Sequence, residues 1–185
     1  MSTTANEVET IWREADCLWT EQQIERAIEA VAQTIETDLA DKDPLVLVVM
    51  KGGMIFGARL VMRLRFPLEL DYIHATRYGL ETQGAELHWK VLPQHPLEGR
   101  HVLVVDDILD EGETLCKILQ SCRQQQPASL RCTVLVDKVH ERKYQPDFKA
   151  DYTCLEVPDR FVFGYGMDYK GYLRNADGIF AVKGL

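Results

Sequence analysis

The sequence contains no apolar run long enough to span a membrane and no segment with the pattern of a secretory signal peptide. It also has no excess of basic residues, because 21 lysines and arginines stand against 29 aspartates and glutamates, a formal net charge of -8. Proteins that bind nucleic acids concentrate positive charge on one face. These absences argue against a membrane partner and against a nucleic-acid partner.

Cysteines are few, scattered and odd in number: Cys17, Cys116, Cys122, Cys132 and Cys154. They lack the paired spacing of zinc sites, and we interpret them as reduced thiols, mostly in the core of a cytoplasmic protein. Internal repeats and low-complexity tracts are also absent. A chain of 185 residues fits one domain.

Apolar patterns along the chain alternate between those of strands and those of helices. A capping box at Thr20 and Gln23 opens a helix that runs to Leu39, whereas residues 1–10 are expected to be frayed. Trp12 and Trp19 are expected to make packing or dimer contacts. Further helices are expected at 54–64 and 115–125, a polar loop at 139–149, and strands at 45–50, 67–75, 87–92, 102–105, 130–136, 152–157 and 178–182. This alternation predicts an α/β fold with a mainly parallel central sheet flanked by helices.

The stretch from His101 to Leu115 carries the strongest chemical signal. A buried strand is followed by Asp106, Asp107 and Asp110, and then by Gly112, Thr114 and a helix. The free N–H groups of a helix N-terminus favour phosphate, whereas carboxylates suit vicinal hydroxyls and Mg²⁺. A ribose phosphate combines these features. The simpler alternative is an ordinary strand–helix turn with acidic side chains in solvent.

Two other predicted strands end in lysine. Lys51 precedes Gly52 and Gly53, and Lys138 ends a later strand. Each alone would be an ordinary turn or a solvated lysine, but ligands of parallel sheets bind beyond the carboxyl ends of the strands. Lys138, an aromatic face at Phe161 and the strand backbone at Val162 would together form a slot for a flat heterocycle. A lysine prefers a carbonyl acceptor, which a 6-oxopurine offers and adenine does not.

Two motifs resemble those of a known family. Residues 104–115, Val-Val-Asp-Asp-Ile-Leu-Asp-Glu-Gly-Glu-Thr-Leu, resemble the phosphoribosyl-pyrophosphate (PRPP) motif of type I phosphoribosyltransferases. Residues 136–139 and 157–169, with Arg174, resemble the hypoxanthine-guanine phosphoribosyltransferases, and the similarity extends over about 45–182. The resemblance implies the type I phosphoribosyltransferase fold as a single domain over 1–185. A small hood would be formed by the N-terminal segment and about 157–182, with a flexible lid loop.

The resemblance also implies a role for each matching residue in purine salvage, in which hypoxanthine or guanine and PRPP give IMP or GMP and pyrophosphate. The expected cofactor is Mg²⁺, and a homo-oligomer (dimer or tetramer) is common in the family. Lys138 would bind O6 of the purine, Phe161 would stack on the ring, and the main chain of Val162 would read position 2. Asp110 is the candidate for proton exchange at purine N7. PRPP would be bound by Asp106, Asp107, Asp110, Glu111, Gly112, Glu113 and Thr114, its pyrophosphate by Lys51, Gly52 and Arg174, and the metal by Asp168, Asp106 and Asp107.

Some positions depart from the family pattern. The family usually has Glu-Asp where this chain has Asp106-Asp107, and often Ser-Tyr where it has Arg77-Tyr78, the candidate lid residues. The family often has a cis peptide at the position of Met50-Lys51.

Alternative functions remain open at the level of sequence. A non-catalytic sensor of PRPP or nucleotides could use the same fold, although the acidic charge and the combined presence of Lys138, Phe161 and Asp168 count against it. A xanthine- or guanine-preferring transferase would differ only around position 2 of the base. Orotate or adenine as substrate is disfavoured by Lys138 and the run at Phe161.

Overall fold

The computed structural model describes residues 5–77 and 87–184. Its largest unit is a six-stranded sheet with the order β4-β3-β2-β5-β6-β7, in which only the β3–β4 pair is antiparallel. The strands are β2 (Leu45–Val49), β3 (Glu69–Arg77), β4 (Leu87–Val91), β5 (His101–Leu109), β6 (Ser129–Val139) and β7 (Tyr152–Pro158). The predicted mainly parallel α/β sheet is therefore confirmed.

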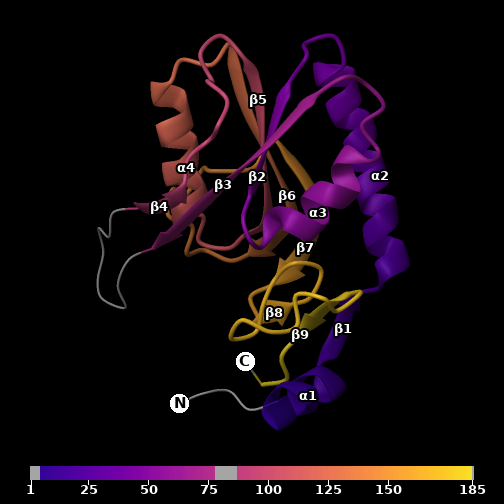
Figure 1. Cartoon of the computed structure of the whole chain (residues 1–185). Coiled ribbons are helices and arrows are strands. Elements are labelled where there is room, and N and C mark those ends of the chain that lie inside the picture. Colours follow the sequence, from indigo (N-terminus) through magenta and orange to yellow (C-terminus); the bar gives the residue numbers. More distant parts are fainter. Residues whose placement is uncertain (1–4, 78–86, 185) are drawn as a thin grey trace.

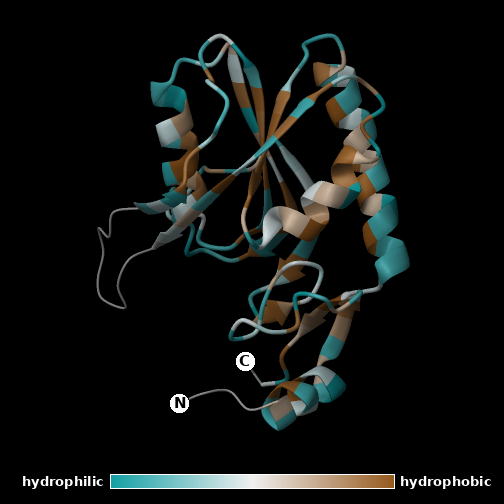
Figure 2. Cartoon of the chain, viewed as in Figure 1, coloured by the Kyte–Doolittle hydropathy of each residue, from teal (hydrophilic) through white to brown (hydrophobic). Residues whose placement is uncertain are grey.

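Helices cover both faces of this sheet (Figure 1). Helices α2 (Glu21–Leu39) and α3 (Gly53–Val61) pack on one face, and α4 (Glu113–Gln124) packs on the other. Successive side chains of a strand point to opposite faces, so Val46 and Val48 join the α2–α3 core while Leu45 and Leu47 join the α4 core. This double burial explains why β2 is apolar throughout and why much of the central sheet is brown in Figure 2.

A second, smaller sheet has the order β1-β9-β8 and lies beyond the lower end of β7 in Figure 1. It consists of β1 (Asp16–Trp19), β8 (Val162–Phe163) and β9 (Ile179–Ala181), and helix α1 (Ala5–Glu14) packs on it. The prediction that residues 1–10 are frayed is wrong from Ala5 onward, because Val8 is buried against Phe163 and Leu173. Trp19 is a packing residue whose Nε1 donates to the Glu156 carbonyl at 3.0 Å.

Two central strands are longer than the sequence predicts. Strand β5 continues through Asp106 and Asp107 to Leu109, because β6 supplies main-chain partners along its whole length. Strand β6 continues in the same way to Val139, alongside β7. Backbone pairing outweighs the polar character of these residues, so the aspartates and Lys138 lie on strands rather than in loops.

Among residues 5–77 and 87–184, no helix is both long and apolar enough to cross a membrane. Of the two candidate lid residues, Arg77 is the last residue of β3, and Tyr78 lies outside the described residues.

Candidate active site

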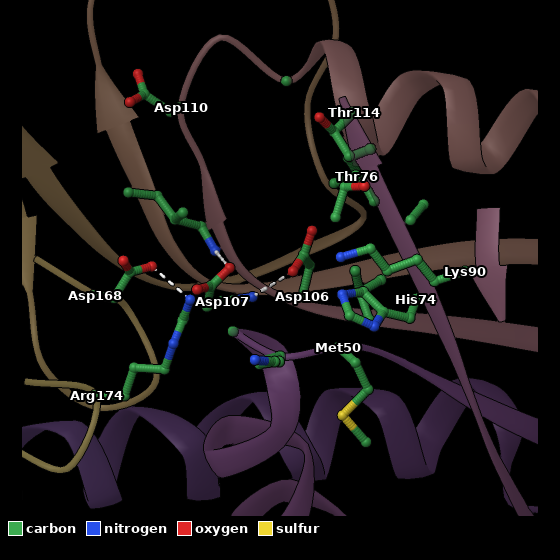
Figure 3. Close-up of a pocket in the computed structure, with 17 residues that line it drawn as sticks. Met50, His74, Thr76, Lys90, Asp106, Asp107, Asp110, Thr114, Asp168 and Arg174 are labelled. Carbon is green, nitrogen blue, oxygen red and sulfur yellow. Dashed lines mark hydrogen bonds and ion pairs between the residues drawn. The ribbon is translucent and has the colours of Figure 1, made fainter. Parts of the chain in front are cut away.

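A cavity of about 500 Å³ opens at the carboxyl ends of β2, β3 and β5. Its walls come from strands of the large sheet, from the turns after β2 and β5, and from the segment that brings in Asp168 and Arg174 (Figure 3). Nine of the residues selected from the sequence line it: Lys51, Gly52, Asp106, Asp107, Asp110, Gly112, Thr114, Asp168 and Arg174. Lys51 and Arg174 thus meet at one site, although they are 123 positions apart in the chain.

Asp106 and Asp107 form the acidic floor of the cavity. Asp106 is 8% exposed, and its Oδ1 accepts a hydrogen bond of 2.9 Å from the main-chain N–H of Asp107. Burial raises the pKa of Asp106 well above its ordinary value, and the neighbouring Asp107 raises it further. Burial also raises the pKa of Asp107, although Arg174 opposes this effect. Two adjacent buried carboxyl groups of this kind attract a cation or hydroxyl donors.

The segment from Gly166 to Arg174, between β8 and β9, brings a charged pair to this floor. Arg174 Nη2 lies 2.5 Å from Asp168 Oδ1, and Arg174 Nη1 donates to the Gly166 carbonyl at 2.6 Å. The other carboxylate oxygen of Asp168 accepts from the N–H of Gly171 at 2.6 Å. The guanidinium is therefore fixed at the edge of the cavity beside Asp107 (Figure 3).

The turn after β2 passes close to the acidic floor. The Met50-Lys51 peptide is cis, as expected from the resemblance. Gly52 precedes helix α3, and a Cβ atom at this position would overlap the carboxylate of Asp107. A side chain there would displace the Asp107 carboxylate, so glycine allows the main chain to approach Asp107 this closely.

The turn after β5 leads into helix α4 through Gly112, whose φ of 84° is in the left-handed region. Thr114 lies in the first helical turn and lines the cavity. The first N–H groups of a helix have no carbonyl partner in a preceding turn, and a helix N-terminus of this kind favours an anion. Glu111 and Glu113 are not among the residues that line the cavity, and Glu113 pairs instead with Lys117 at 2.8 Å.

Asp110 connects this turn to the end of β6. One of its oxygens, Oδ2, accepts from Lys138 Nζ at 2.6 Å, and the other, Oδ1, lies 2.8 Å from His140 Nε2. Burial opposes ionisation, but the hydrogen bonds from Lys138 and His140 outweigh it and lower the pKa of Asp110 below its ordinary value. The group at this corner of the site is thus a carboxylate with two donors.

The three predicted base-binding residues, Lys138, Phe161 and Val162, lie outside the lining of the cavity. Phe161 is 43% exposed and meets Tyr169 edge to face, with ring centroids 5.6 Å apart. Val162 is buried in β8, where it pairs with Ala181. Phe163 is a core residue stacked on Phe180, so of the two phenylalanines only Phe161 presents an accessible ring.

Several residues of the site were not predicted from the sequence. His74, Thr76 and Lys90, from β3 and β4, line the cavity opposite the aspartates. Burial, Lys90 and Lys51 lower the pKa of His74. The spacing of His74 and Thr76, which places them on one face at the end of a strand, was the signal available. His140 and Lys143 lie in a polar loop that has no comparable signal.

The three carboxylates expected to bind Mg²⁺ do not form one cage. In the described part of the chain, no group of three or more histidine, cysteine, aspartate or glutamate side chains is arranged to enclose a metal ion. Mg²⁺ is commonly bound by one or two carboxylates together with substrate phosphates and water. The adjacent buried carboxylates of Asp106 and Asp107 fit this mode of binding.

Comparisons with known proteins agree on one family. The sequence model of the phosphoribosyl transferase domain family matches residues 16–170. The chain is 33% identical over 168 residues to the hypoxanthine-guanine phosphoribosyltransferase of Bacillus subtilis, covering 90% of this chain and 92% of that protein. It is 34% identical to the hypoxanthine-guanine-xanthine phosphoribosyltransferase of Tritrichomonas foetus, covering 90% of each.

The folds agree as well. A solved variant of the Trypanosoma cruzi hypoxanthine phosphoribosyltransferase, complexed with the product IMP, superposes with a TM-score of 0.85 at 32% identity, covering 92% of each chain. A Bacillus anthracis hypoxanthine-guanine phosphoribosyltransferase superposes with a TM-score of 0.82 at 30% identity, covering 90% of this chain and 97% of that one. Sequence and fold together place the chain in the phosphoribosyltransferase family, among the hypoxanthine-guanine phosphoribosyltransferases.

Proposed function

We propose that this protein is a purine-salvage phosphoribosyltransferase that converts hypoxanthine and guanine, with PRPP, to IMP, GMP and pyrophosphate. The observation that carries the proposal is the contact between Lys138 and Asp110 beside the helix N-terminus at Thr114. This arrangement brings together three groups: Lys138 as a donor for a ring carbonyl, Asp110 as an acceptor for a ring proton, and the helix N-terminus as a phosphate site. The names of the related proteins support the same reaction.

PRPP binds along the cavity in this proposal. The N–H groups of residues 110–114 and the Thr114 hydroxyl hold the 5′-phosphate, with Glu111 and Glu113 contributing main-chain groups rather than carboxylates. Asp106 and Asp107 bind the ribose hydroxyls. Lys51, the main chain at Gly52 and Arg174 bind the pyrophosphate group, since they bring positive charge and main-chain N–H groups to the cavity.

Mg²⁺ is the proposed cofactor, held by Asp106 and Asp107 together with substrate oxygens, with Asp168 at the edge of the site. When bound, it supplies positive charge that stabilises the departing pyrophosphate. Asp168 is engaged by Arg174 and Gly171, so its contribution requires a rearrangement of those contacts or a bridging water.

The purine occupies the corner between Lys138 and Phe161. Lys138 donates to O6, Phe161 offers its exposed ring for stacking, and the main chain of Val162 reads position 2. Adenine would place an amino group against the lysine donor, and a mismatch of buried polar groups of this kind discriminates by roughly 10⁴.

The reaction exchanges one bond at C1′ of the ribose for another. N9 of the base forms a bond to C1′, the bond from C1′ to the pyrophosphate oxygen breaks with its electron pair on pyrophosphate, and the N7 proton passes to Asp110. The sugar acquires positive charge in between, which the carboxylates of Asp106 and Asp107 stabilise. General acid–base assistance by Asp110 is typically worth about 10² to 10⁴ in rate.

The remaining proposals concern the whole molecule. We propose one domain over residues 1–185, with the small sheet as a hood over the base and a lid at Arg77 and Tyr78. We also propose a cytoplasmic location and a homo-oligomer, a dimer or tetramer. Exposed apolar side chains on and directly after α3, on β3 and directly after β4 support self-association: Met54, Met62, Leu70, Tyr72 and Leu92. Light scattering coupled to size exclusion would give the mass of the assembly.

A turnover assay tests the proposed function. Purified protein, PRPP and Mg²⁺ are mixed separately with hypoxanthine, guanine, xanthine and adenine, and nucleotide formation is followed. We expect product from hypoxanthine and guanine and none from adenine. Product mainly from xanthine, which the name of the Tritrichomonas relative includes, would change the interpretation at position 2. Absence of product from every base, with PRPP still bound, would favour a sensor.

A further inference from the structure

His140 is a buried polar side chain at the start of the loop that follows β6. Its side chain is only 3% exposed, whereas that of Asp110, which it contacts, is 43% exposed. Burying an imidazole costs free energy unless both ring nitrogens find partners. Both do: Nε2 lies 2.8 Å from Asp110 Oδ1, and Nδ1 accepts a hydrogen bond of 3.0 Å from the main-chain N–H of Arg142.

These two contacts determine which ring nitrogen carries the proton. The Arg142 N–H is a donor, so Nδ1 is an acceptor and carries no hydrogen. Nε2 then carries the proton and donates it to Asp110 Oδ1. A proton on Nδ1 would face the main-chain N–H directly, so this geometry favours the neutral ring with hydrogen on Nε2.

We propose that His140 is a positioning residue for Asp110: its neutral ring holds Oδ1 and orients Oδ2 toward the N7 proton of the purine. This inference rests on the proposed function. It adds a residue that touches neither PRPP nor the base and acts only through Asp110.

The two donors on Asp110 have different fates in this scheme. Lys138 contacts Oδ2, and the same ammonium group is the proposed donor to O6 of the base. When Lys138 turns to O6, the purine N7–H takes its place on Oδ2. His140 keeps Oδ1 throughout, so the carboxylate does not rotate when its other partner changes.

Other charged groups surround Asp110 and His140, and most of them are engaged with partners of their own. Arg142 pairs with Asp159 in solvent, and Lys143 pairs with Asp137 at 2.6 Å. The ionisable groups that face Asp110 and His140 are Lys138, Arg142, Lys143, Asp137 and Asp159. Of the side-chain hydrogen bonds to Asp110, the one from Lys138 reaches Oδ2, and the one from His140 reaches Oδ1.

Two variants distinguish the loss of the hydrogen-bond donor from the loss of the imidazole ring itself. His140→Leu removes the donor, whereas His140→Gln retains an N–H donor at about the reach of Nε2. A hydrogen bond to a charged group contributes about ten- to a hundredfold. We expect His140→Leu to lower kcat for hypoxanthine by about that factor with KM for PRPP unchanged, and His140→Gln to restore most of the rate.

The pH dependence distinguishes positioning from folding. Loss of a donor destabilises the ionised form of Asp110, so its pKa rises, and the acid limb of the kcat/KM profile should move to higher pH in His140→Leu. His140→Gln should leave that limb near its original position. The matched control is His101→Leu, which removes a half-buried histidine bonded to Ser129 at the opposite end of β5 and should leave the profile unchanged.

The outcomes for this inference and for the proposed function are separable. A wild-type protein that forms no nucleotide refutes the proposed function. An active wild type with an equally active His140→Leu variant, its acid limb unmoved, overturns the role of His140 alone. Histidine ¹⁵N spectra of the whole chain provide a test without turnover, with the signal assigned by its loss in His140→Gln. We expect hydrogen on Nε2 only, and hydrogen on Nδ1 at neutral pH would overturn the proposal.

Discussion

The turn after β5 and the loop after β6 are neighbours at the same edge of the sheet, but they differ in what they contribute. The turn, Asp110 to Gly112, contributes Asp110 and Gly112 to the lining of the cavity. The loop at 140–148 contributes none of the residues that line it. The loop instead supports the turn: Lys143 donates to the carbonyls of Leu109 and Asp110 at 2.8 Å each.

More contacts of the same kind follow along this loop. The main-chain N–H of Tyr144 donates to the Glu111 carbonyl at 2.8 Å, and His140 holds Oδ1 of Asp110. The side-chain contacts join positions 30 to 34 residues apart in the chain. The comparison teaches that binding groups are concentrated in one short turn, while the groups that fix its geometry come from a different crossover. Variants of the turn and of the loop should therefore affect binding and stability to different degrees.

The largest effect should come from the turn itself. Asp110→Asn removes the acceptor for the N7 proton but leaves the N–H groups around it in place. We expect kcat to fall by about 10² to 10⁴, with little change in PRPP affinity. Initial rates with hypoxanthine and calorimetric titration with PRPP measure the two quantities. Normal turnover in this variant would remove Asp110 from the chemistry.

The next effect should come from the loop. Lys143→Met keeps most of the length of the side chain but removes donors to two carbonyls and to Asp137, on a side chain that is 13% exposed. We expect the free energy of unfolding to fall by roughly 1–3 kcal/mol, because hydrogen bonds to charged groups contribute on this scale. KM for PRPP should also rise. Urea unfolding gives the first quantity, and Lys149→Met, directly after the loop, is the control.

An unchanged KM for PRPP in a destabilised Lys143→Met protein would mean that the loop stabilises the fold without shaping the phosphate site. The turn and the loop would then differ only in that the turn binds substrate and the loop stabilises the protein. A rise in KM for PRPP without loss of stability would mean that the loop shapes the phosphate site without stabilising the fold.

The contrast between the turn and the loop also explains which features could be predicted from the sequence. Local patterns predict the parallel sheet, the helices on its faces and the motif at 104–115. The spacing of apolar residues and the polar residues next to them can be recognised within a few positions of the sequence. The ends of β5 and β6 were misjudged, since Asp106 and Lys138 remain in strands only through their neighbours' main chains. Helix α1 was missed because Val8 finds its partners more than 150 positions away, at Phe163.

The supporting residues of the site could not be predicted for the same reason. His140 and Lys143 belong to a polar stretch whose composition is that of any surface loop. Only the fold shows that their side chains are nearly buried and directed at the preceding crossover. The exposed Phe161 and the buried Phe163 likewise look equivalent in sequence and differ only in what the small sheet covers.

A smaller effect should follow from strain within the turn. Gly112 has φ of 84°, and an alanine Cβ there would meet the side chain of Leu109. Gly99 has a similar φ of 70°, but no atom lies within 4 Å of its Cβ position. Both alanine variants should lose about 1 kcal/mol of stability, since non-glycine residues are disfavoured in this region. Only Gly112→Ala should also raise KM for PRPP, and equal values of KM in the two variants would contradict the proposed phosphate site.

The smallest effect should come from the outer edge of the loop, where Arg142 and Asp159 pair in solvent at 2.5 Å. The hydrogen bond from Arg142 lowers the pKa of Asp159 from 3.8 to about 2. A lowered pKa in the folded state contributes stability above the unfolded value, and this stability is lost as the pH falls from about 4 to about 2. Asp159→Asn should therefore be slightly less stable than wild type at pH 5, with the difference shrinking toward pH 2.

Because the pair is exposed, high salt should also reduce that difference. Urea midpoints at pH 5, 4 and 3, each in low and high salt, measure it. Catalysis should be unaffected at neutral pH, since the Arg142 N–H that contacts His140 belongs to the main chain and not to the ion pair. A fall in kcat for Asp159→Asn would mean that the ion pair holds the loop in the position from which His140 reaches Asp110, and that the support extends from the cavity to the surface.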